Sequence, residues 1–324
     1  MKTYLILSLF IMCIMVFFPM ITFTVPTEDF SNTNRNEETN IQNEAFSDKI
    51  EVIRTSSGKV ESVDIKKYII GSVACEMPAS FHEEALKAQA VACYTYLRWL
   101  EDNSDNMSGE IGDISDDSSK HQGYLNEEEL KEKWGENYEK YYDKIEKIVT
   151  ETYGQYIAYH NEPILSVFHA ISPGVTNSAK DVWGSSVPYL LSVSAPGDKL
   201  SEKLECTYEF TADDLKDTLK NNDIEFNNDR EMKITDIIRT ESGYTTEIKI
   251  NGVKYSGKEI RNIFSLKSPN FTVEVDKDIY IFKVYGIGHG VGMSQYSADF
   301  MARQGSNYKE ILCHFYSGTE LKTD

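Results

Sequence analysis

The pattern of hydrophobic and polar positions predicts a polar stretch near the N-terminus, followed by a mixture of helices and strands. An apolar run from Tyr4 to about Val25 precedes the segment Glu28 to Asn43, in which almost no residue is apolar. Apolar and polar residues alternate from Ile50 to Arg54, as they do in a strand with one buried face, and Ser57-Gly58 supplies a turn. Ordered structure is therefore expected to begin near Ile50.

Two helices are predicted on either side of Pro78. The first follows Asp64, a residue type that caps helices, and Pro78 prevents its continuation. Ser80 to Glu83 has the form of a capping box, and the alanine-rich run 85–92 predicts a long second helix. Glu76 is therefore expected at a corner between two helices, where the fold can fix a side chain that still faces a cleft.

The next hundred residues predict a loop, a helix and short strands. The acidic, Gly/Ser-rich stretch from Glu101 to Lys120 is expected to be a long surface loop, and Glu127 to Val149 a helix. Gly154 to His160 and Pro163 to His169 are typical of a strand pair, and Tyr189 to Val193 predicts a further strand.

The stretch 206–283 has a different texture and predicts a small β-rich subdomain. One amphipathic helix is expected after Thr211, followed by short alternating segments such as Thr245 to Ile250 and Phe271 to Val275. Residues 286–292 then carry glycine at every second position, and two helices are predicted before the C-terminus. The expected fold class is α+β, with a helical catalytic core, mixed strands, this β-rich subdomain and a single N-terminal transmembrane anchor.

The N-terminal apolar run predicts that the chain is attached to a membrane. Its length approaches the roughly 20 residues that span a bilayer, and the residues around Val25 do not form a convincing Ala-x-Ala cleavage pattern. An uncleaved anchor over residues 1–26 is therefore favoured over a cleaved signal peptide. Lys2 before the run and the acidic segment after it place the body outside the cytoplasm. We expect a single-pass protein of the cell membrane, with a polar linker over 27–49 and an extracytoplasmic ectodomain over 50–324.

Composition and charge narrow the possible partners and chemistry. The 33 basic and 52 acidic residues give a formal charge of -19, which would repel a phosphate backbone, so no nucleic-acid partner is expected. Four of the five cysteines lie beyond the anchor at wide spacings without a CxxC pair, and the six histidines form no HExxH motif. No metal or other cofactor is therefore expected. One disulfide, a composite zinc site from distant residues and a Cys/His nucleophilic pair that uses Cys75 or Cys93 remain alternatives.

Two features are candidates for chemistry. Glu76 has apolar neighbours, so burial could raise its pKa toward the range of a proton donor at neutral pH, although a solvated glutamate at a helix end is the plainer interpretation. The glycines of 286–292 do not have the spacing of a nucleotide-binding loop. They could leave bare backbone for a flat ligand such as a sugar ring, with His289 bonding a hydroxyl group, or they could mark a tight strand crossing.

Several ordered motifs resemble those of the stage II sporulation protein D family, and the similarity runs through nearly the whole ectodomain. The motifs are Glu76-Met77-Pro78, the run 84–92, His121-Gln122, Asp181-Val182-Trp183, Pro188-Tyr189-Leu190 and the segment 288–296. The resemblance implies a lytic transglycosylase that cleaves peptidoglycan glycan strands, stripped of stem peptides, during engulfment in endospore-forming bacteria. It also implies partners, namely a cell-wall amidase and a membrane scaffold protein.

The resemblance assigns the catalytic acid/base to Glu76. This single carboxyl group would protonate the leaving glycosidic oxygen and then deprotonate the 6-hydroxyl of the same muramic acid, which leaves a 1,6-anhydro end. The family positions that would bind the saccharide fall on Lys87, Tyr94, His121, Gln122, Ser172, Gly174, His289, Gly290 and Gln295.

Two residues depart from the family's pattern. Tyr94 stands where the family usually has an arginine, and Pro173 replaces the middle residue of a Ser-Gly-Gly motif. Because these changes could alter activity, a non-catalytic cell-wall binding or amidase-enhancing module is the alternative function. A metallo- or cysteine peptidase is a third hypothesis, which predicts inhibition by a chelator or by thiol alkylation.

Overall fold

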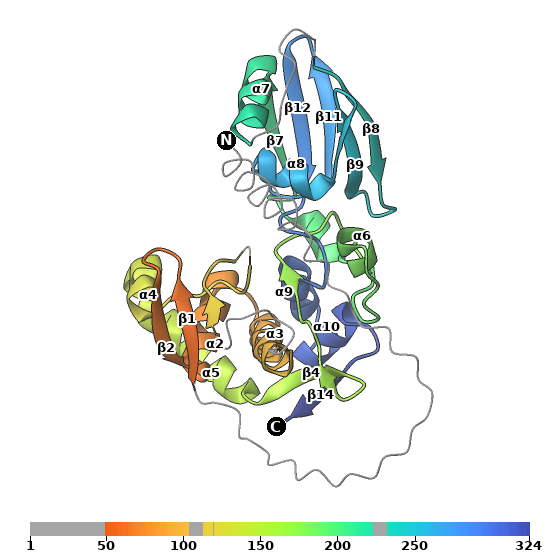
Figure 1. The fold of residues 1–324 in the computed structure, drawn as a ribbon. Helices are drawn as coiled ribbons and strands as arrows, with labels where there is room; N and C mark the ends of the chain where they lie inside the picture. The colour runs from red at the N-terminus through yellow and green to blue at the C-terminus, as the bar shows by residue number, and fades with distance from the viewer. Residues whose placement is uncertain (1–48, 104–112, 119, 223–231) are drawn as a thin grey trace, which may run out of the picture. The chain divides into compact units, whose positions relative to one another are not determined.

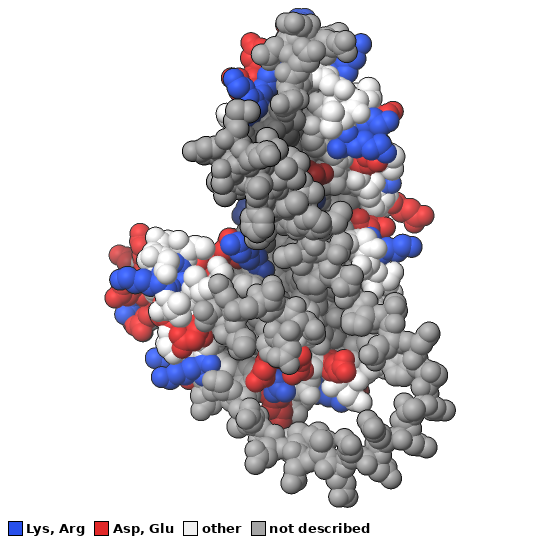
Figure 2. Space-filling model, viewed as in Figure 1, with Lys and Arg blue, Asp and Glu red and all other residues white. Residues whose placement is uncertain are grey.

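The computed structural model describes residues 49–103, 113–118, 120–222 and 232–324 (Figure 1). The predicted anchor and nearly all of the predicted linker lie outside the described residues. Within the described ranges, no helix is long and apolar enough to cross a membrane. The described part is α+β, as predicted, with several helices and small sheets. Acidic and basic side chains are interspersed on the described surface of the face in Figure 2.

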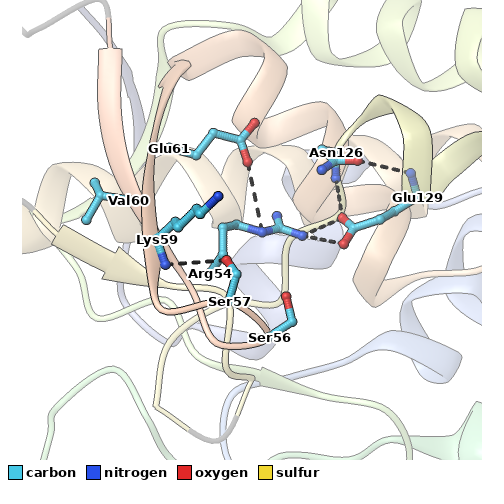
Figure 3. Close-up of a pocket in the computed structure, with 8 residues that line it drawn as sticks. All are labelled: Arg54, Ser56, Ser57, Lys59, Val60, Glu61, Asn126 and Glu129. Atoms are coloured by element: carbon cyan, nitrogen blue, oxygen red, sulfur yellow. Dashed lines mark hydrogen bonds and ion pairs between the residues drawn. The ribbon is translucent and has the colours of Figure 1, made fainter.

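A β-hairpin begins the described structure. Strand β1 (Lys49–Arg54) pairs antiparallel with β2 (Lys59–Asp64) and parallel with β3 (Asp113–Ser115). Strand β3 falls within the stretch predicted to be surface loop, so that prediction is wrong there. A pocket of about 360 Å³ opens beside the hairpin, lined by Arg54, Ser56, Ser57, Lys59, Val60, Glu61, Asn126 and Glu129 (Figure 3).

The two predicted helices meet at a corner. Helix α2 (Ile65–Glu76) begins at Asp64, whose carboxylate accepts the backbone N–H of Lys67, and α3 spans Glu83–Asp102. The predicted capping box at Ser80 is wrong: α3 is capped by His82, whose Nδ1 accepts the N–H of Glu84 at 3.2 Å. We call residues 77–82, between the two helices, the corner loop.

Helix α3 is central to the helical part, because it contacts α2, α5, α9, α10 and β4 (Figure 1). Its alanines at 85, 88, 90 and 92 are buried and allow this close packing. The single helix predicted over 127–149 is instead α4 (Glu127–Trp134), a short 3₁₀ turn (Gly135–Asn137) and α5 (Tyr138–Thr152). Gly135 ends α4 in a conformation with φ of 50°, which an L side chain rarely adopts.

Strand β4 (Gln155–Tyr159) lies between β5 (Glu162–Pro163) and β14 (Glu320–Thr323). The second strand of the predicted pair is therefore much shorter than expected. Strand β6 (Phe168–His169) pairs in parallel with β13 (Met293–Ser294) instead. No strand forms over the described residues 189–193.

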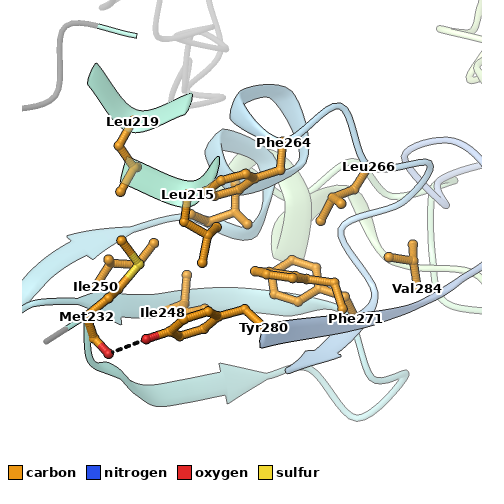
Figure 4. Packing of buried hydrophobic residues seen from close by; sticks show 12 residues of the cluster. Leu215, Leu219, Met232, Ile248, Ile250, Phe264, Leu266, Phe271, Tyr280 and Val284 are labelled. Atoms are coloured by element: carbon orange, nitrogen blue, oxygen red, sulfur yellow. Dashed lines mark hydrogen bonds between the residues drawn. The ribbon is translucent and has the colours of Figure 1, made fainter. Parts of the chain in front are cut away.

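The β-rich stretch has its own core between two three-stranded sheets and two helices (Figure 4). The buried rings of Phe271, Tyr280 and Phe282 lie in this core, and the Tyr280 hydroxyl donates to the Met232 carbonyl at 2.7 Å. The elements are β7 (Glu205–Thr211), α7 (Ala212–Asn221), β8 (Ile234–Arg239), β9 (Thr245–Ile250), β10 (Val253–Tyr255), α8 (Gly257–Ile263), β11 (Phe271–Asp276) and β12 (Ile279–Tyr285).

The remaining helices surround the parallel pair β6–β13. They are α6 (Ala179–Trp183), the 3₁₀ helix η3 (Pro196–Leu200), α9 (Gln295–Arg303) and α10 (Tyr308–Phe315). Both C-terminal helices were predicted, and Gly305 follows α9 with a φ of 101°.

Candidate active site

Glu76 is the last residue of α2. The helix ends there because Met77 is extended, with its N–H bonded to the Val73 carbonyl, and Pro78 follows. The side chain of Met77 is buried at 1% exposure, so the corner loop is fixed by packing directly beside the carboxyl group. Glu76 itself keeps partial exposure, as a residue that meets a substrate requires.

One backbone group holds the carboxyl group of Glu76. The N–H of Gly123 donates to Glu76 Oε1 at 2.7 Å. A side chain at position 123 would prevent this approach, because its Cβ would lie 2.9 Å from Glu76 Oε1 and 2.7 Å from Cys75 Sγ. Glycine is therefore required at position 123 by space.

The surroundings raise the pKa of Glu76 above its ordinary value. Burial is the largest cause, while the Gly123 N–H and the positive charge of Lys133 act in the opposite direction. Among the described residues, no second carboxylate contributes to this shift. The site thus offers one carboxyl group that binds a proton readily and whose ionised form still has a hydrogen-bond donor.

Lys133 is tied to the same helix end. Its Nζ donates to the carbonyls of Ala74 at 2.8 Å and Cys75 at 3.3 Å, which are left without helical partners at the C-terminus of α2. A cation at this end also complements the helix dipole. Neither Lys133 nor Gly123 was singled out by the sequence, because each lies far along the chain from Glu76.

The residues around Gly123 include two predicted site residues. His121 accepts the Ser115 N–H on Nδ1 at 2.9 Å, and burial lowers its pKa, so the ring stays neutral. Gln122 is 4% exposed, and neither Oε1 nor Nε2 of its amide has a hydrogen-bond partner within the described structure. Such an orphaned pair of polar atoms is unusual in a folded protein and indicates a place for a water or a ligand group.

The glycine segment 286–292 is a tight crossing rather than an open sugar-binding face. Its four glycines all have positive φ, between 72° and 105°, so the segment is not extended. If alanine replaced Gly290, its Cβ would lie 2.1 Å from the Tyr244 hydroxyl, and a Cβ at Gly292 would lie 2.0 Å from the Val167 carbonyl. Protein atoms therefore fill the space that a ligand would have used at these positions.

His289 is held by backbone groups on both sides. Its Nδ1 accepts the Val291 N–H at 3.1 Å, and the backbone of Phe168 bonds the ring as well. Burial is the main cause that lowers its pKa to about 3, so the ring is neutral at physiological pH. The bond to a sugar hydroxyl expected from sequence would require His289 to give up one of these backbone contacts.

A neighbouring histidine has the unused nitrogen. His169 is 4% exposed, bonds the Val291 carbonyl through Nδ1 at 3.1 Å, and its Nε2 has no partner within the described ranges. Burial lowers its pKa to about 4. The rings of His169 and His289 lie 5.9 Å apart, and the half-exposed ring of Trp183 lies 6.2 Å from His289.

Three predicted site residues gather around a buried carboxylate that the sequence did not reveal. Asp198 is fully buried, and its oxygens accept the N–H and hydroxyl of Ser172, both at 2.6 Å, and the hydroxyls of Ser294 and Ser297. Its pKa is raised by burial although these bonds lower it. Asp198 is one of 52 acidic residues, and no local motif distinguishes it.

The same cluster approaches the corner loop. Gln295 donates from Nε2 to Gln89 Oε1 of α3 at 3.3 Å, and the ring of Tyr296 meets Phe81 edge-on at 5.2 Å. Gly174 lies under Lys199, whose Cε would be 2.2 Å from a Cβ at that position. The structure thus connects the segments of Ser172, Gly174 and Gln295 to the corner that presents Glu76.

Lys87 and Tyr94 face other parts of the molecule. Lys87 forms ion pairs with Glu84 at 3.0 Å and with Glu151 of α5 at 3.1 Å. The Tyr94 hydroxyl donates to Asp324, and its ring lies 5.5 Å from that of Tyr153. These partners belong to α3, the end of α5 and the C-terminus rather than to the corner loop.

Comparison with known proteins gives the family. A family model described as "Stage II sporulation protein" matches residues 54–159. The stage II sporulation protein D of Bacillus subtilis (strain 168) is 37% identical over 273 residues, which cover 84% of this chain and 78% of that protein. The chain belongs to the stage II sporulation protein D family. The Bacillus amyloliquefaciens protein of the same name is 36% identical over 273 residues, with the same coverage. A B. subtilis protein named amidase enhancer is 26% identical over 302 residues, covering 78% of this chain and 40% of that protein.

The other chemical alternatives lack support in the described residues of this family member. Burial is the first cause that raises the pKa of Cys75 to about 11 and of Cys93 to about 12, so neither thiol is a ready nucleophile. All four cysteines beyond the anchor are free. Within the described ranges, no three His, Cys, Asp or Glu side chains come together as metal ligands would.

Proposed function

We propose that this protein is a lytic transglycosylase that cleaves the glycan strands of peptidoglycan during sporulation, with Glu76 as its acid/base. The observation that carries the proposal is the state of that carboxyl group. It is largely buried, its pKa is raised, and one of its oxygens is held by the Gly123 N–H. Family membership connects this carboxyl group to sporulation.

One carboxyl group is enough for this reaction. Protonated Glu76 gives its proton to the glycosidic oxygen as the bond from that oxygen to C1 of muramic acid breaks. The 6-hydroxyl oxygen of the same sugar then bonds to C1, and its proton passes to the Glu76 carboxylate. The product is a 1,6-anhydro end, no water is consumed, and the enzyme returns to its starting state. Hydrolysing glycosidases use two carboxylates instead.

The two effects on Glu76 suit its two roles. Burial favours the protonated form that begins the reaction, whereas the Gly123 N–H and Lys133 stabilise the carboxylate that must exist between the two proton transfers. A catalytic group works best when its pKa lies near the working pH, and opposed effects of this kind bring it there.

The remaining site residues have proposed supporting roles. The free amide of Gln122 is offered as a partner for polar groups of the sugar, beside the acid. We further propose that residues 1–26 anchor the protein in the cell membrane with the ectodomain outside. Its partners there would be glycan strands stripped of stem peptides, a cell-wall amidase and a membrane scaffold protein.

The test uses amidase-treated peptidoglycan and the matched variant Glu76→Gln. Wild-type protein should release fragments with 1,6-anhydro-muramic acid ends, detected by mass spectrometry, and Glu76→Gln should release at least roughly 100-fold fewer, as expected for a lost acid/base. Equal product from Glu76→Gln would exclude Glu76 as the acid/base.

A second function is suggested by the relative named amidase enhancer. A protein of that kind would raise the rate at which an amidase removes stem peptides, whether or not Glu76 is present. Adding wild type or Glu76→Gln to an amidase assay separates the two functions, since stimulation that persists in the variant supports enhancement.

A further inference from the structure

Arg54, the last residue of β1, has a side chain of only 9% exposure beside the pocket of Figure 3. Its Nη2 lies 2.5 Å from both carboxylate oxygens of Glu129, and its Nε lies 3.3 Å from Asp116 and 3.9 Å from Glu61. Three carboxylates thus compensate one buried guanidinium. An arginine at such a position serves the structure around it rather than binding an anion from solution.

Arg54 also faces the ring of Tyr124. The guanidinium carbon lies 5.1 Å from the ring centroid, and Tyr68 of α2 stacks against Tyr124 at 5.2 Å and 18°. Gly71 of α2 makes room for this arrangement, because a Cβ there would lie 2.6 Å from the Tyr124 ring and 2.3 Å from the Leu125 carbonyl. Tyr124 is therefore confined by Arg54, Tyr68 and the backbone of α2.

The same arginine fixes the chain on the other side of Tyr124. Glu129, its bidentate partner, completes the capping box of α4 by accepting the Asn126 N–H at 2.8 Å. Tyr124 directly follows Gly123, and Asn126 lies three residues beyond it. A displacement of either contact would move the Gly123 N–H, and that group has to lie within 2.7 Å of Glu76 Oε1.

We propose that Arg54 is a positioning residue for the acid: through Tyr124 and Glu129 it holds the segment 123–126 so that the Gly123 N–H stays on Glu76. The consequence for catalysis rests on the proposed function, whereas the consequence for Glu76 itself does not. An arginine is needed because one planar group bonds Glu129 in bidentate fashion while its face lies on a ring, and lysine cannot do both.

Other groups near Glu76 act independently of Arg54. Lys133 of α4 lowers the pKa of Glu76 through its charge, and Cys75, Cys93 and Tyr68 are neutral groups whose own pKa values are raised. The Gly123 N–H is therefore the contact through which a change at Arg54 reaches Glu76. Because that bond stabilises the carboxylate, its loss raises the pKa of Glu76.

The test compares Arg54→Met and Arg54→Lys with wild type. Lysine keeps a charge near the three carboxylates, so this variant tests the proposal even if the methionine variant does not fold. The Glu76 carboxyl carbon and the Gly123 amide are followed by NMR in a pH titration. Both variants should raise the pKa of Glu76, and the Gly123 amide should respond less to its ionisation. An unchanged pKa and amide response in Arg54→Lys would overturn the proposal.

Arg98→Met is the matched control. Arg98 also pairs with a carboxylate, Asp324, at 2.5 Å and also lies over a tyrosine ring, Tyr156, at 5.3 Å, but on the side of β4. The control variant should lose thermal stability as the Arg54 variants do, yet leave the pKa of Glu76 unchanged. A rise in the control equal to that in Arg54→Met would show a general effect of destabilisation and would contradict the positioning role.

Activity separates this inference from the proposed function. If the protein is a transglycosylase, Arg54→Lys should lower kcat/KM roughly tenfold at neutral pH and move the basic limb of its pH profile upward with the pKa of Glu76. If wild type releases no anhydro ends while the NMR titration changes as expected, the proposed function is wrong and the positioning role stands. An unchanged pH profile in an active Arg54→Lys variant counts against that role.

Discussion

Two lysines bond carbonyl groups at the corner that presents Glu76, but only one acts on its charge. Lys133 donates to Ala74 and Cys75 at the end of α2, and Lys144 of α5 donates to the carbonyls of Ala79 at 2.8 Å and Phe81 at 2.6 Å. Lys133 lowers the pKa of Glu76, whereas Lys144 is not among the groups that shift it. The pair therefore separates electrostatic tuning from support of the corner.

We predict different outcomes for Lys133→Met and Lys144→Met. Each variant should lose about 1.5 kcal/mol of unfolding free energy, since each removes a charged donor from buried carbonyls. Only Lys133→Met should also raise the pKa of Glu76, because it removes a positive charge that favours the carboxylate. Denaturant titration and NMR titration of the Glu76 carboxyl group measure the two effects. A similar rise in Lys144→Met would mean that the corner loop, not the charge of Lys133, controls the acid.

At the level of single residues, sequence reached the acid but not its environment. The apolar neighbours of Glu76 and the proline after it are local signals, and both predicted a buried carboxyl group at a helix end. Gly123 and Lys133 reach Glu76 only through tertiary contacts across 47 and more positions, which no local pattern encodes. Tyr94 shows the converse, because its place in a family motif suggested a cleft residue while the fold directs it to Asp324.

Among the elements, the glycine segment 286–292 differs most from expectation. Alternating glycines were compatible with both an exposed sugar-binding surface and a tight crossing. The structure shows the crossing, because each glycine has positive φ and its Cβ position is occupied by protein atoms, such as the Tyr244 hydroxyl at Gly290. Sequence could not decide between the two, since the occupying atoms come from β6, its flanking residues and the β-rich stretch.

Gly290→Ala should therefore be far more damaging than Gly305→Ala. Gly305 also has positive φ, at 101°, but has open space around its Cβ position, so alanine there should cost about 1 kcal/mol of unfolding free energy from backbone strain alone. At Gly290 the contact with Tyr244 adds overpacking, for a total of about 3 kcal/mol. Chemical denaturation of both variants gives the difference, and equal losses would show that the crossing can relax.

Other elements followed the sequence where the signal was local. Helices α2 and α9 begin and end near the predicted residues because caps, proline and glycine lie within a few positions. The long helix after residue 127 was wrong because Gly135 interrupts an otherwise continuous pattern. Strand β3 was missed because only its pairing with β1 makes three polar-rich residues a strand.

On the scale of the whole molecule, Glu76 and Asp198 make the fold less stable at neutral pH than it would be without their charges. Both carboxyl groups have a raised pKa because of burial. The folded protein therefore binds their protons more tightly than the unfolded chain does. Their contribution to stability is fully present below the ordinary carboxyl pKa and is lost as pH rises through the folded-state value. His169 and His289, with pKa values lowered to about 4 and about 3, act in the opposite sense and oppose folding as pH falls below 6.5.

The last prediction concerns Glu76→Gln and follows from this sign. Glutamine can still accept the Gly123 N–H but never carries the buried charge, so the variant should be more stable than wild type at pH 7 to 8, on the order of 1 kcal/mol. The gain should disappear as pH falls below about 4, where Glu76 is protonated in both the folded and the unfolded protein. Unfolding free energies at several pH values measure the difference, with Lys144→Met as a corner variant whose difference from wild type should not vary with Glu76 ionisation. A variant less stable than wild type at pH 8 would mean that Lys133 and Gly123 outweigh burial, and the carboxyl group would then be a poor proton donor at neutral pH.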